Sequence, residues 1–255
     1  MRIVAIANQK GGTGKTTTAV NLGAVLGELG RRVLLVDLDP QGNATDWIGG
    51  RKGEPGAWTL LVDNARVEEV VTTTSLPGVD LIPASPWLFG IERALAGTVG
   101  AEMILRRQLR GMDPDRWDYV LIDCPPTLGL LTVGALAAAH RVLAPVEAHV
   151  MALAGLAQLL QTVELVRERL NPDLSWSGFL LCRVDARTRH ALEVAEKLRE
   201  YFPDQVFQTV IRENVRLAEC FSFKKPITVY DPRASGAEDF RALGREFLMR
   251  EEGLR

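Results

Sequence analysis

Lys10-Gly11-Gly12-Thr13-Gly14-Lys15-Thr16-Thr17 follows the apolar run Ile3-Val4-Ala5-Ile6-Ala7 near the start of this chain. Glycine has no Cβ, so a stretch this rich in glycine can turn its backbone N–H groups toward an anion. A helix that begins near Lys15 would add the positive end of its dipole on the same side. The order of strand, glycine-rich loop and helix predicts a phosphate-binding loop of the compact form K-G-G-x-G-K-[ST]-T.

The side chains of this loop suit a nucleoside triphosphate, either ATP or GTP. We expect Lys15 to reach the β- and γ-phosphates and the Thr16 hydroxyl to ligate Mg²⁺. Lys10 stands one residue before the glycines, and on its own it is an ordinary surface lysine. The residues predicted to bind the nucleotide in this loop are Gly11, Gly12, Thr13, Gly14, Lys15, Thr16 and Thr17.

Short β-branched and apolar runs alternate with longer helical patterns along the chain. Such an order is typical of a parallel sheet that is covered on both faces. The prediction is an α/β P-loop NTPase, a mostly parallel twisted sheet with helices on both faces, in a single domain over residues 1–255. We expect strands at 3–7, 33–36, 79–82, 119–122, 142–146 and 178–181, helices near 15–29, 88–111, 129–138, 151–170, 188–201 and 236–250, and a surface connector at 49–57.

Two of the expected strands end in aspartate, at the edge of the sheet where ligands of parallel sheets bind. Asp37 and Asp39 follow the strand 33–36, and alternation along the chain puts both carboxylates on one side of the strand end. Asp123 follows the strand 119–122, and we expect it to hold Mg²⁺ directly or through water. An aspartate at a strand end also caps turns and helices. The phosphate loop upstream favours functional roles for Asp39 and Asp123, whereas Asp37 stays open between a structural and a functional role.

Taken together, these motifs resemble the deviant Walker A family of ATPases that includes ParA, Soj and MinD, and the resemblance extends through nearly the whole chain. It implies ATP as the nucleotide. It also implies that two ATP-bound subunits pack face to face and that Lys10 reaches the partner's phosphates in trans, like an arginine finger. Residues 37–45 resemble the family's switch I, so Asp39 is expected to position the attacking water. Lys10, Lys15 and Asp39 are therefore the predicted catalytic residues.

The last third of the chain resembles Soj-like proteins at residues 185–188, 214–217 and 230–238. The resemblance implies that Asn214 recognises adenine and that Arg187 and Arg216 bind DNA without sequence preference. Arg212 stands where the family usually has proline, which bears on the geometry around Asn214. Residues 181–233 carry ten Lys and Arg against eight Asp and Glu, a weak basic patch. The predicted contacts with DNA phosphates are Arg187, Arg189, Arg216, Lys224 and Lys225.

Composition restricts the remaining classes of function. The formal net charge is −2, so attraction to nucleic acid or to a membrane has to come from a local patch. Cys124, Cys182 and Cys220 lie far apart, and a disulfide framework, a zinc site or an iron–sulfur site is not predicted. The chain shows no pattern of a signal peptide or of a spanning helix, so we expect a cytoplasmic protein. Of the two aromatics next to Lys224, Phe221 and Phe223, we expect at least one to lie in the core.

The sequence therefore predicts a ParA/Soj-like ATPase that forms a homodimer on binding ATP and Mg²⁺ and associates with the nucleoid by binding DNA non-specifically. A ParB-like partner would stimulate a slow hydrolysis, and the outcome would be chromosome or plasmid segregation or the positioning of another cargo. The alternative is a MinD-like ATPase that associates with the membrane. The apolar stripe of residues 236–250 is more typical of a docked helix, and its acidic residues oppose an anionic surface. A metabolic ATP-dependent enzyme is a third hypothesis, and the sequence does not identify the cargo.

Overall fold

The computed structural model describes residues 1–53, 55–148, 152–185 and 189–253. Within these residues one sheet runs in the strand order β3-β4-β2-β5-β1-β6-β7-β8. All neighbours pair in parallel except β3 and β4, which pair antiparallel at one edge. The strands are β1 (Arg2–Ile6), β2 (Val33–Asp37), β3 (Thr72–Thr73), β4 (Val79–Ile82), β5 (Tyr119–Asp123), β6 (Arg141–Glu147), β7 (Ser175–Val184) and β8 (Ile211–Arg212).

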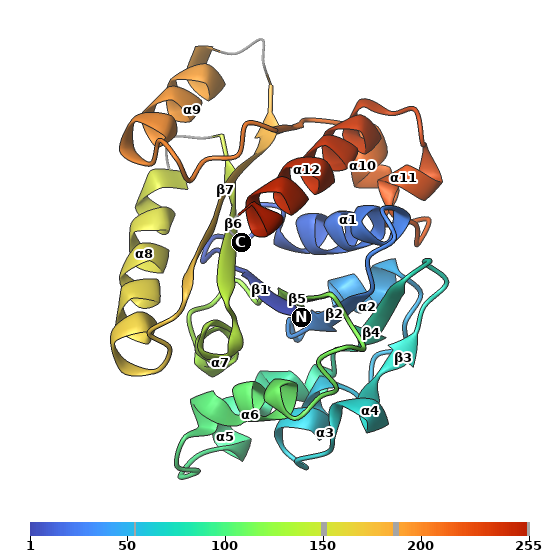
Figure 1. Cartoon of the computed structure of the whole chain (residues 1–255), viewed down its shortest axis with the longest axis vertical. Coiled ribbons are helices and arrows are strands. Elements are labelled where there is room, and N and C mark those ends of the chain that lie inside the picture. The colour runs from blue at the N-terminus through green and yellow to red at the C-terminus, as the bar shows by residue number, and fades with distance from the viewer. Residues whose placement is uncertain (54, 149–151, 186–188, 254–255) are drawn as a thin grey trace.

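Helices cover both faces of this sheet, as the ribbon in Figure 1 shows. The face with α1 and α12 is filled by one apolar cluster, and the face with α3 to α9 is filled by another. Adjacent residues of β1 belong to opposite clusters, Ile3 to one and Val4 to the other, because successive side chains of a strand point to opposite faces. The prediction of an α/β P-loop fold with a mostly parallel sheet is confirmed.

The helices that cover the sheet vary from single turns to five turns. Two of the short segments, η1 and η2, are 3₁₀ helices. The helices are α1 (Lys15–Glu28), α2 (Asn43–Trp47), α3 (Ala57–Leu61), α4 (Val67–Val70), η1 (Pro86–Gly90), α5 (Ile91–Ala94), η2 (Ala101–Met103), α6 (Ile104–Arg110), α7 (Leu130–Ala138), α8 (Ala152–Arg169), α9 (Arg189–Tyr201), α10 (Val215–Glu219), α11 (Ile227–Tyr230) and α12 (Ser235–Glu252). Within the described ranges, no helix has the length and apolar character needed to cross a membrane.

The expected helix at 88–111 is wrong. The chain instead forms η1, α5, η2 and α6 in succession. Gly97 and Gly100 have φ angles of +80° and +70°, in the left-handed region, and a right-handed helix cannot continue through them. The two-residue strands β3 and β8 were also not predicted, because a strand of two residues is too short to appear in the sequence as an apolar run.

The last helix, α12, packs along α1 with its apolar stripe. Phe240, Leu243 and Phe247 are fully buried there. At Gly244 a Cβ atom would lie 2.4 Å from a side-chain carbon of Val25 on α1, so the close approach of the two helices requires glycine. The apolar face of α12 is therefore occupied by the protein's own core.

His140, just before β6, supports the start of β1. Its Nδ1 accepts a hydrogen bond from the backbone N–H of Ile3 at 3.0 Å. Although part of the residue is exposed, desolvation of the ring and the charge of Arg2 lower the pKa of His140 below 6.5. Between the folded and the unfolded pKa of His140, the unfolded state therefore binds more protons than the folded state. The free energy of unfolding rises with pH across this window and is highest, as far as His140 is concerned, above it.

We expect His140→Gln to flatten the pH dependence of the free energy of unfolding between pH 7 and pH 5. Glutamine keeps an acceptor but does not titrate, so the stability that the parent protein loses as pH falls through the folded pKa of His140 would not be lost. Denaturant unfolding at several pH values measures this, and a histidine NMR titration locates the pKa directly. An unchanged slope, or a His140 pKa at or above 6.5, would contradict the assignment.

Candidate functional site

A cavity of about 590 Å³ opens where β1, β2 and β7 end. This is the carboxyl edge of the sheet, beside the central strand β1, where parallel sheets bind their ligands. The cavity brings together residues from the loop after β1, the segment after β2, the end of β7 and α10. Of the predicted site residues, it is lined by Gly11, Gly12, Gly14, Lys15, Thr16, Thr17, Asp39 and Asn214.

The loop between β1 and α1 has the backbone of an anion cradle. Gly12 and Gly14 have φ angles of +77° and +92°, which only glycine adopts readily, and α1 begins directly after them at Lys15. The Nζ of Lys15 donates a hydrogen bond to the carbonyl of Lys10 at 3.1 Å, so the lysine folds back over the loop. Burial lowers the pKa of Lys15, and the nearby Asp123 carboxylate acts in the opposite direction. Backbone N–H groups, the N-terminal end of α1 and the buried Lys15 ammonium together make the loop suited to bind an anion.

Asp123 lies beside Asp37, because β5 and β2 are neighbours and the two residues are register partners. Both side chains are fully buried. Burial, and then the charge of Asp37, raise the pKa of Asp123 well above its usual range. Neither oxygen of Asp123 has a hydrogen-bond partner with good geometry in the described part of the chain. A buried carboxylate with two unsatisfied oxygens is costly unless a cation or a donor reaches it.

The unsatisfied carboxylate of Asp123 raises the question whether the residues around it could hold a metal ion. No cluster of three or more acidic, histidine or cysteine side chains suited to a metal occurs among the described residues. Mg²⁺ does not need one, since it commonly takes one or two protein oxygens and completes its shell with phosphate and water. Thr16 lines the cavity, and the fully buried Asp123 lies close enough behind it for the Thr16 hydroxyl to oppose part of the rise in the pKa of Asp123. The donors present fit Mg²⁺ held against a bound triphosphate.

Asp37 and Asp39 have different surroundings. Asp37 accepts hydrogen bonds from the Thr45 hydroxyl (2.7 Å), the Thr45 N–H (2.8 Å) and the Asp39 N–H (3.2 Å). Burial raises the pKa of Asp37 to about 6 in spite of these bonds. Asp37 therefore anchors α2 to the end of β2, which favours the structural role that the sequence left open. Asp39 accepts one bond, from the Gln41 N–H at 2.9 Å, and it lines the cavity.

The connector at 49–57 does more than join two elements. Lys52 forms an ion pair with Asp46 at 2.6 Å and donates a hydrogen bond to the Gln41 carbonyl. Its side chain also covers Gly42, where a Cβ would overlap with it. The connector therefore braces the segment that carries Asp39.

Lys10 does not line the cavity. Its Nζ forms an ion pair with Glu147 at 2.8 Å, and Arg183 contacts the other oxygen of the same carboxylate at 3.2 Å. In this single chain Lys10 is thus held by a carboxylate of its own subunit. Its predicted role in trans is not tested by a single subunit.

The far end of the cavity is formed by α10 and the loop before it. Asn214 caps α10 by accepting a hydrogen bond from the Leu217 N–H at 3.2 Å, and its amide donates to the Ser235 hydroxyl at 2.5 Å. Both ends of the amide are therefore engaged, which fixes its orientation toward the cavity. Arg212, at the family's usual proline position, is held by Asp239 at 2.6 Å and lines the same cavity. The loop is braced by this ion pair where a proline ring would stiffen it.

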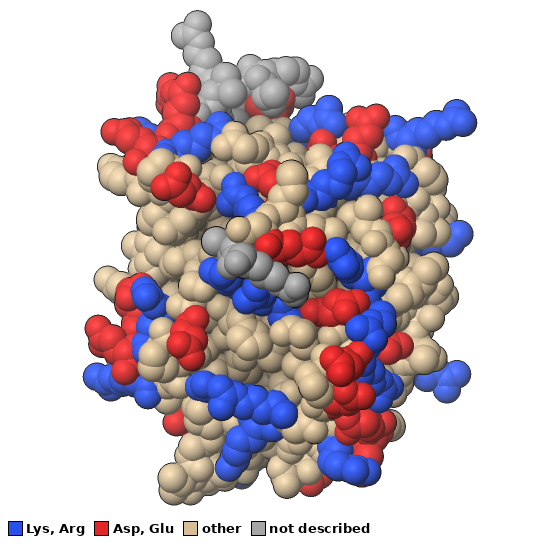
Figure 2. All heavy atoms as spheres, in the orientation of Figure 1, with Lys and Arg blue, Asp and Glu red and all other residues tan. Residues whose placement is uncertain are grey.

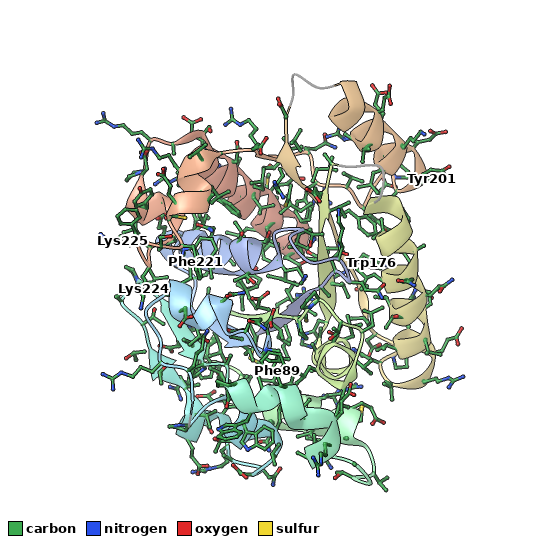
Figure 3. All side chains as sticks on the ribbon, turned by 180° about the vertical axis from the view of Figure 1, so that it is seen from behind. Phe89, Trp176, Tyr201, Phe221, Lys224 and Lys225 are labelled. Carbon is green, nitrogen blue, oxygen red and sulfur yellow. The ribbon has the colours of Figure 1, made fainter. Side chains whose placement is uncertain are left out.

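The residues predicted to contact DNA are only partly described. Arg187 and the side chain of Arg189 lie outside the described residues. The Arg216 guanidinium pairs with Glu219 at 3.1 Å and with Asp231 at 3.8 Å. Lys224 and Lys225 are exposed, and Figure 3 shows them at the opposite side of the molecule from Tyr201, where α9 ends. On the face seen in Figure 2, positive and negative side chains are interspersed.

The expectation that Phe221 or Phe223 lies in the core is wrong. Phe221 is 38% exposed and meets Trp47 edge-on at 5.5 Å, and Phe223 is 59% exposed and stacks on Tyr230 at 4.8 Å. Both lie on the short segment between α10 and α11. The buried apolar position in this region is taken by Ile227, which is fully buried. Figure 3 places Phe221 close to the two lysines, so this turn presents aromatic and basic side chains together.

Several lining residues were missed by sequence reasoning. Cys182 and Arg183 reach the cavity from the end of β7, and Phe240 reaches it from α12. The rule that ligands bind at the carboxyl ends of parallel strands would have flagged the first two. Glu147, the partner of Lys10, ends β6 and was equally open to that rule. Phe240 carried no such signal, because its position depends on how α12 folds back over α1.

Comparisons with known proteins are consistent over the length of the chain. A family model described as an AAA domain matches residues 1–176. The chain is 49% identical to the sporulation initiation inhibitor protein Soj of Bacillus subtilis, over 96% of this chain and 97% of that protein. It is 46% identical to the chromosome partitioning protein ParA of Myxococcus xanthus, over 98% and 89%.

A solved structure is also similar over the whole chain. It is that of cobyrinic acid a,c-diamide synthase from Mycobacterium smegmatis with a bound ATP analogue and magnesium. The TM-score is 0.87 and the identity 35%, over 100% of this chain and 97% of that chain.

Proposed function

The chain belongs to the Soj/ParA family of chromosome-partitioning ATPases, and from this premise we propose that it binds ATP with Mg²⁺ in the cavity beside β1 and hydrolyses it as a homodimer. The observation that carries the proposal is the glycine cradle at Gly12 and Gly14 together with the buried carboxylate of Asp123, which has no hydrogen-bond partner among the described residues and lies near Lys15 and Thr16 of the same loop. The loop suits phosphate, and Thr16 with the Asp123 carboxylate beside it suits a metal ion. Residues 1–255 act as a single ATPase domain.

The residues around the cavity divide the work of phosphoryl transfer, which needs positioning and charge neutralisation more than covalent chemistry. Lys15 and the N–H groups of residues 11–17 hold the triphosphate. Thr16 and Asp123 hold Mg²⁺, which neutralises charge on the phosphate oxygens when bound. Asp39 positions the attacking water, and its carboxylate has the freedom that Asp37, fixed by Thr45, lacks. Asn214 faces the base at the far end of the cavity.

Hydrolysis is completed by a second subunit. Lys10 lies beside the loop and outside the cavity of its own subunit, which suits a residue that reaches across to a partner's phosphates. A single subunit then binds ATP without a complete catalytic site, and slow intrinsic hydrolysis follows. A ParB-like protein that favours the closed dimer would raise the rate.

The output of the ATP-bound dimer is non-specific binding to nucleoid DNA, through phosphate contacts by Arg187, Arg189, Arg216, Lys224 and Lys225. Positive and negative side chains are interspersed on the face seen in Figure 2, and Arg216 is paired with Glu219, so we expect a single subunit to bind DNA weakly. Pairing two subunits doubles the number of phosphate contacts, and the affinity rises steeply with that number. DNA binding therefore follows the nucleotide state.

We expect retention on non-specific DNA to require ATP and to fall steeply with salt. The pair Arg187→Glu with Arg216→Glu should lower retention by about tenfold or more, because it replaces phosphate contacts by repulsion. Retention measured with ATP, with ADP and without nucleotide across a salt series tests this. A matched control is Arg66→Glu with Arg167→Glu, which changes the net charge equally at arginines that, like Arg216, have carboxylate partners; these partners lie on α4 and α8. Retention that ignores the nucleotide, or an equal loss in the control, would refute the DNA-binding output.

Two alternative functions, a membrane-associated role and a biosynthetic role, can each be compared with a specific observation. A MinD-like membrane role would use the apolar face of the last helix, but that face of α12 is buried against α1. A biosynthetic role is suggested by the solved diamide synthase, yet the Soj and ParA relatives are more similar in sequence over nearly the same span. ATP-dependent sedimentation with anionic vesicles would favour the first alternative. Hydrolysis that requires cobyrinic acid rather than DNA would favour the second.

A further inference from the structure

One carboxylate is shared by two cations beside the phosphate loop. Glu147, the last residue of β6, receives the Nζ of Lys10 on Oε2 at 2.8 Å and a guanidinium nitrogen of Arg183 on Oε1 at 3.2 Å. Lys10 comes from the loop after β1, and Arg183 comes from the end of β7. Three neighbouring strands of the sheet thus contribute one residue each to a cation–anion–cation arrangement.

The carboxylate is the least exposed member of this group. The side chain of Glu147 is 21% exposed, against 37% for Lys10 and 56% for Arg183. A partly buried carboxylate that loses its only cation bears an uncompensated desolvation cost. With a second cation in place, the first can leave at lower cost, because the charge of Glu147 remains paired.

Arg183 has a backbone that keeps it in this place. Its φ angle is +53°, a left-handed conformation that is uncommon for residues other than glycine and asparagine. Such a conformation persists where the surroundings fix it, and it often marks a functional site. Arg183 also lines the nucleotide cavity, as does its neighbour Cys182, whose side chain lies close to Gly14. The second cation of Glu147 is therefore fixed at the edge of the nucleotide cavity and stays beside Glu147 when Lys10 leaves.

We infer that Glu147 is a positioning residue that holds Lys10 in its own subunit and that Arg183 replaces Lys10 as the counter-ion of Glu147 when Lys10 moves to the partner's phosphates. This inference rests on the proposed in-trans role of Lys10. Glu147 is paired with two cations before Lys10 leaves and with Arg183 afterwards, so its charge is never left without a cation. It sets the threshold for dimer closure: Glu147 opposes the release of Lys10, and Arg183 lowers that opposition.

The test is a double-mutant cycle on the dependence of ATP hydrolysis on protein concentration. Glu147→Gln should shift the half-maximal protein concentration down by roughly two- to fivefold, the range that ion pairs of this kind usually supply. Arg183→Met should shift it up by a similar factor. In the Glu147→Gln background, Arg183→Met should have no effect, because there is no carboxylate left to neutralise. Arg183→Lys should restore the parent value.

Controls separate this mechanism from a general structural effect. Glu164→Gln removes a carboxylate from an exposed ion pair with Arg167 on α8 and should leave the concentration dependence unchanged. ATP affinity at dilutions where the protein is monomeric should be equal in the parent, Glu147→Gln and Glu164→Gln; because Arg183 lines the nucleotide cavity, its variants are compared at saturating ATP. If Glu147→Gln behaves as the parent, or if Arg183→Met has the same effect with and without Glu147, the inference is overturned. Lys10→Ala is assayed in parallel: if hydrolysis by this variant still rises with protein concentration, the proposed in-trans function itself fails, a result distinct from failure of the exchange.

Discussion

Lys15→Ala is expected to lower the affinity for ATP by at least about a hundredfold. Lys15 is the cation at the closed end of the cavity, held over the loop by its hydrogen bond to the Lys10 carbonyl. Its ammonium group would make charge-assisted contacts with the β- and γ-phosphates, and each contact of this type contributes roughly 1.5–3 kcal/mol. Two such contacts correspond to a factor of about one hundred or more in the dissociation constant.

The measurement is ATP binding by calorimetry or by a fluorescent analogue, in Mg²⁺ and at protein concentrations that keep the chain monomeric. Lys197→Ala, which removes an exposed lysine from α9, is the control for loss of one positive charge. An affinity within a few fold of the parent would show that Lys15 is not a phosphate ligand. The fold itself should persist, because the hydrogen bond of the Lys15 ammonium goes to a carbonyl of its own loop, and the buried Asp123 carboxylate, which loses a favourable charge, can take up a proton.

Lys10→Ala in the same assay gives the contrast that separates the two lysines of the loop. Lys10 points away from the cavity to Glu147, so its removal should leave ATP affinity close to that of the parent. Hydrolysis that rises with protein concentration should instead be lost. Equal loss of ATP binding in both variants would show that the two lysines act together in one subunit, and the in-trans role would be wrong.

The phosphate loop could be predicted from sequence because its determinants are local. Glycines at fixed positions, a lysine and a threonine between a strand and a helix specify the backbone without help from the rest of the fold. Asp39 and Asp123 could also be predicted, because each lies at the end of an apolar strand. The carboxyl ends of the strands in a parallel sheet meet at one edge. In the structure the loop residues and Asp39 line one cavity, and Asp123 lies buried beside Asp37 at the same edge of the sheet. The chemical roles of these residues remain predictions.

Other features depend on contacts between distant segments and could not be predicted. The pairing of Lys10 with Glu147 joins residues 137 positions apart, and it arises only because β1 and β6 are neighbours in the sheet. The contacts of Lys52 with the segment that carries Asp39 depend on how the connector folds back. Phe221 and Phe223 were misassigned because hydrophobicity indicates burial only where the fold leaves room inside. The prediction of a helix at 88–111 was wrong although the evidence against it was local. Gly97 and Gly100 indicate breaks in a helix, but the helical periodicity around them was given more weight.

Asp39→Ala is expected to stop hydrolysis and to trap the ATP-bound dimer. Asp39 lines the cavity and is only 7% exposed, and among its hydrogen bonds is one to the Gln41 N–H. Its removal takes away the group that positions the attacking water and leaves the phosphate loop intact. Positioned acid–base groups contribute about 10²–10⁴ in rate, so hydrolysis should fall by at least about a hundredfold. ATP binding should persist, and the population of dimer should rise because the bound ATP is no longer consumed.

Size determination with ATP, by light scattering or sedimentation, distinguishes the outcomes. The parent should shift between monomer and dimer as ATP is consumed, and Asp39→Ala should stay dimeric. Asp46→Ala, on α2 just beyond the same segment, removes a carboxylate that pairs with Lys52 and should not trap the dimer. Asp37→Ala should lower the stability of the fold instead, because the Thr45 and Asp39 N–H groups lose their buried acceptor. A monomeric Asp39→Ala in saturating ATP would refute the assignment, since a subunit that binds but cannot hydrolyse ATP has no route out of the dimer other than nucleotide dissociation.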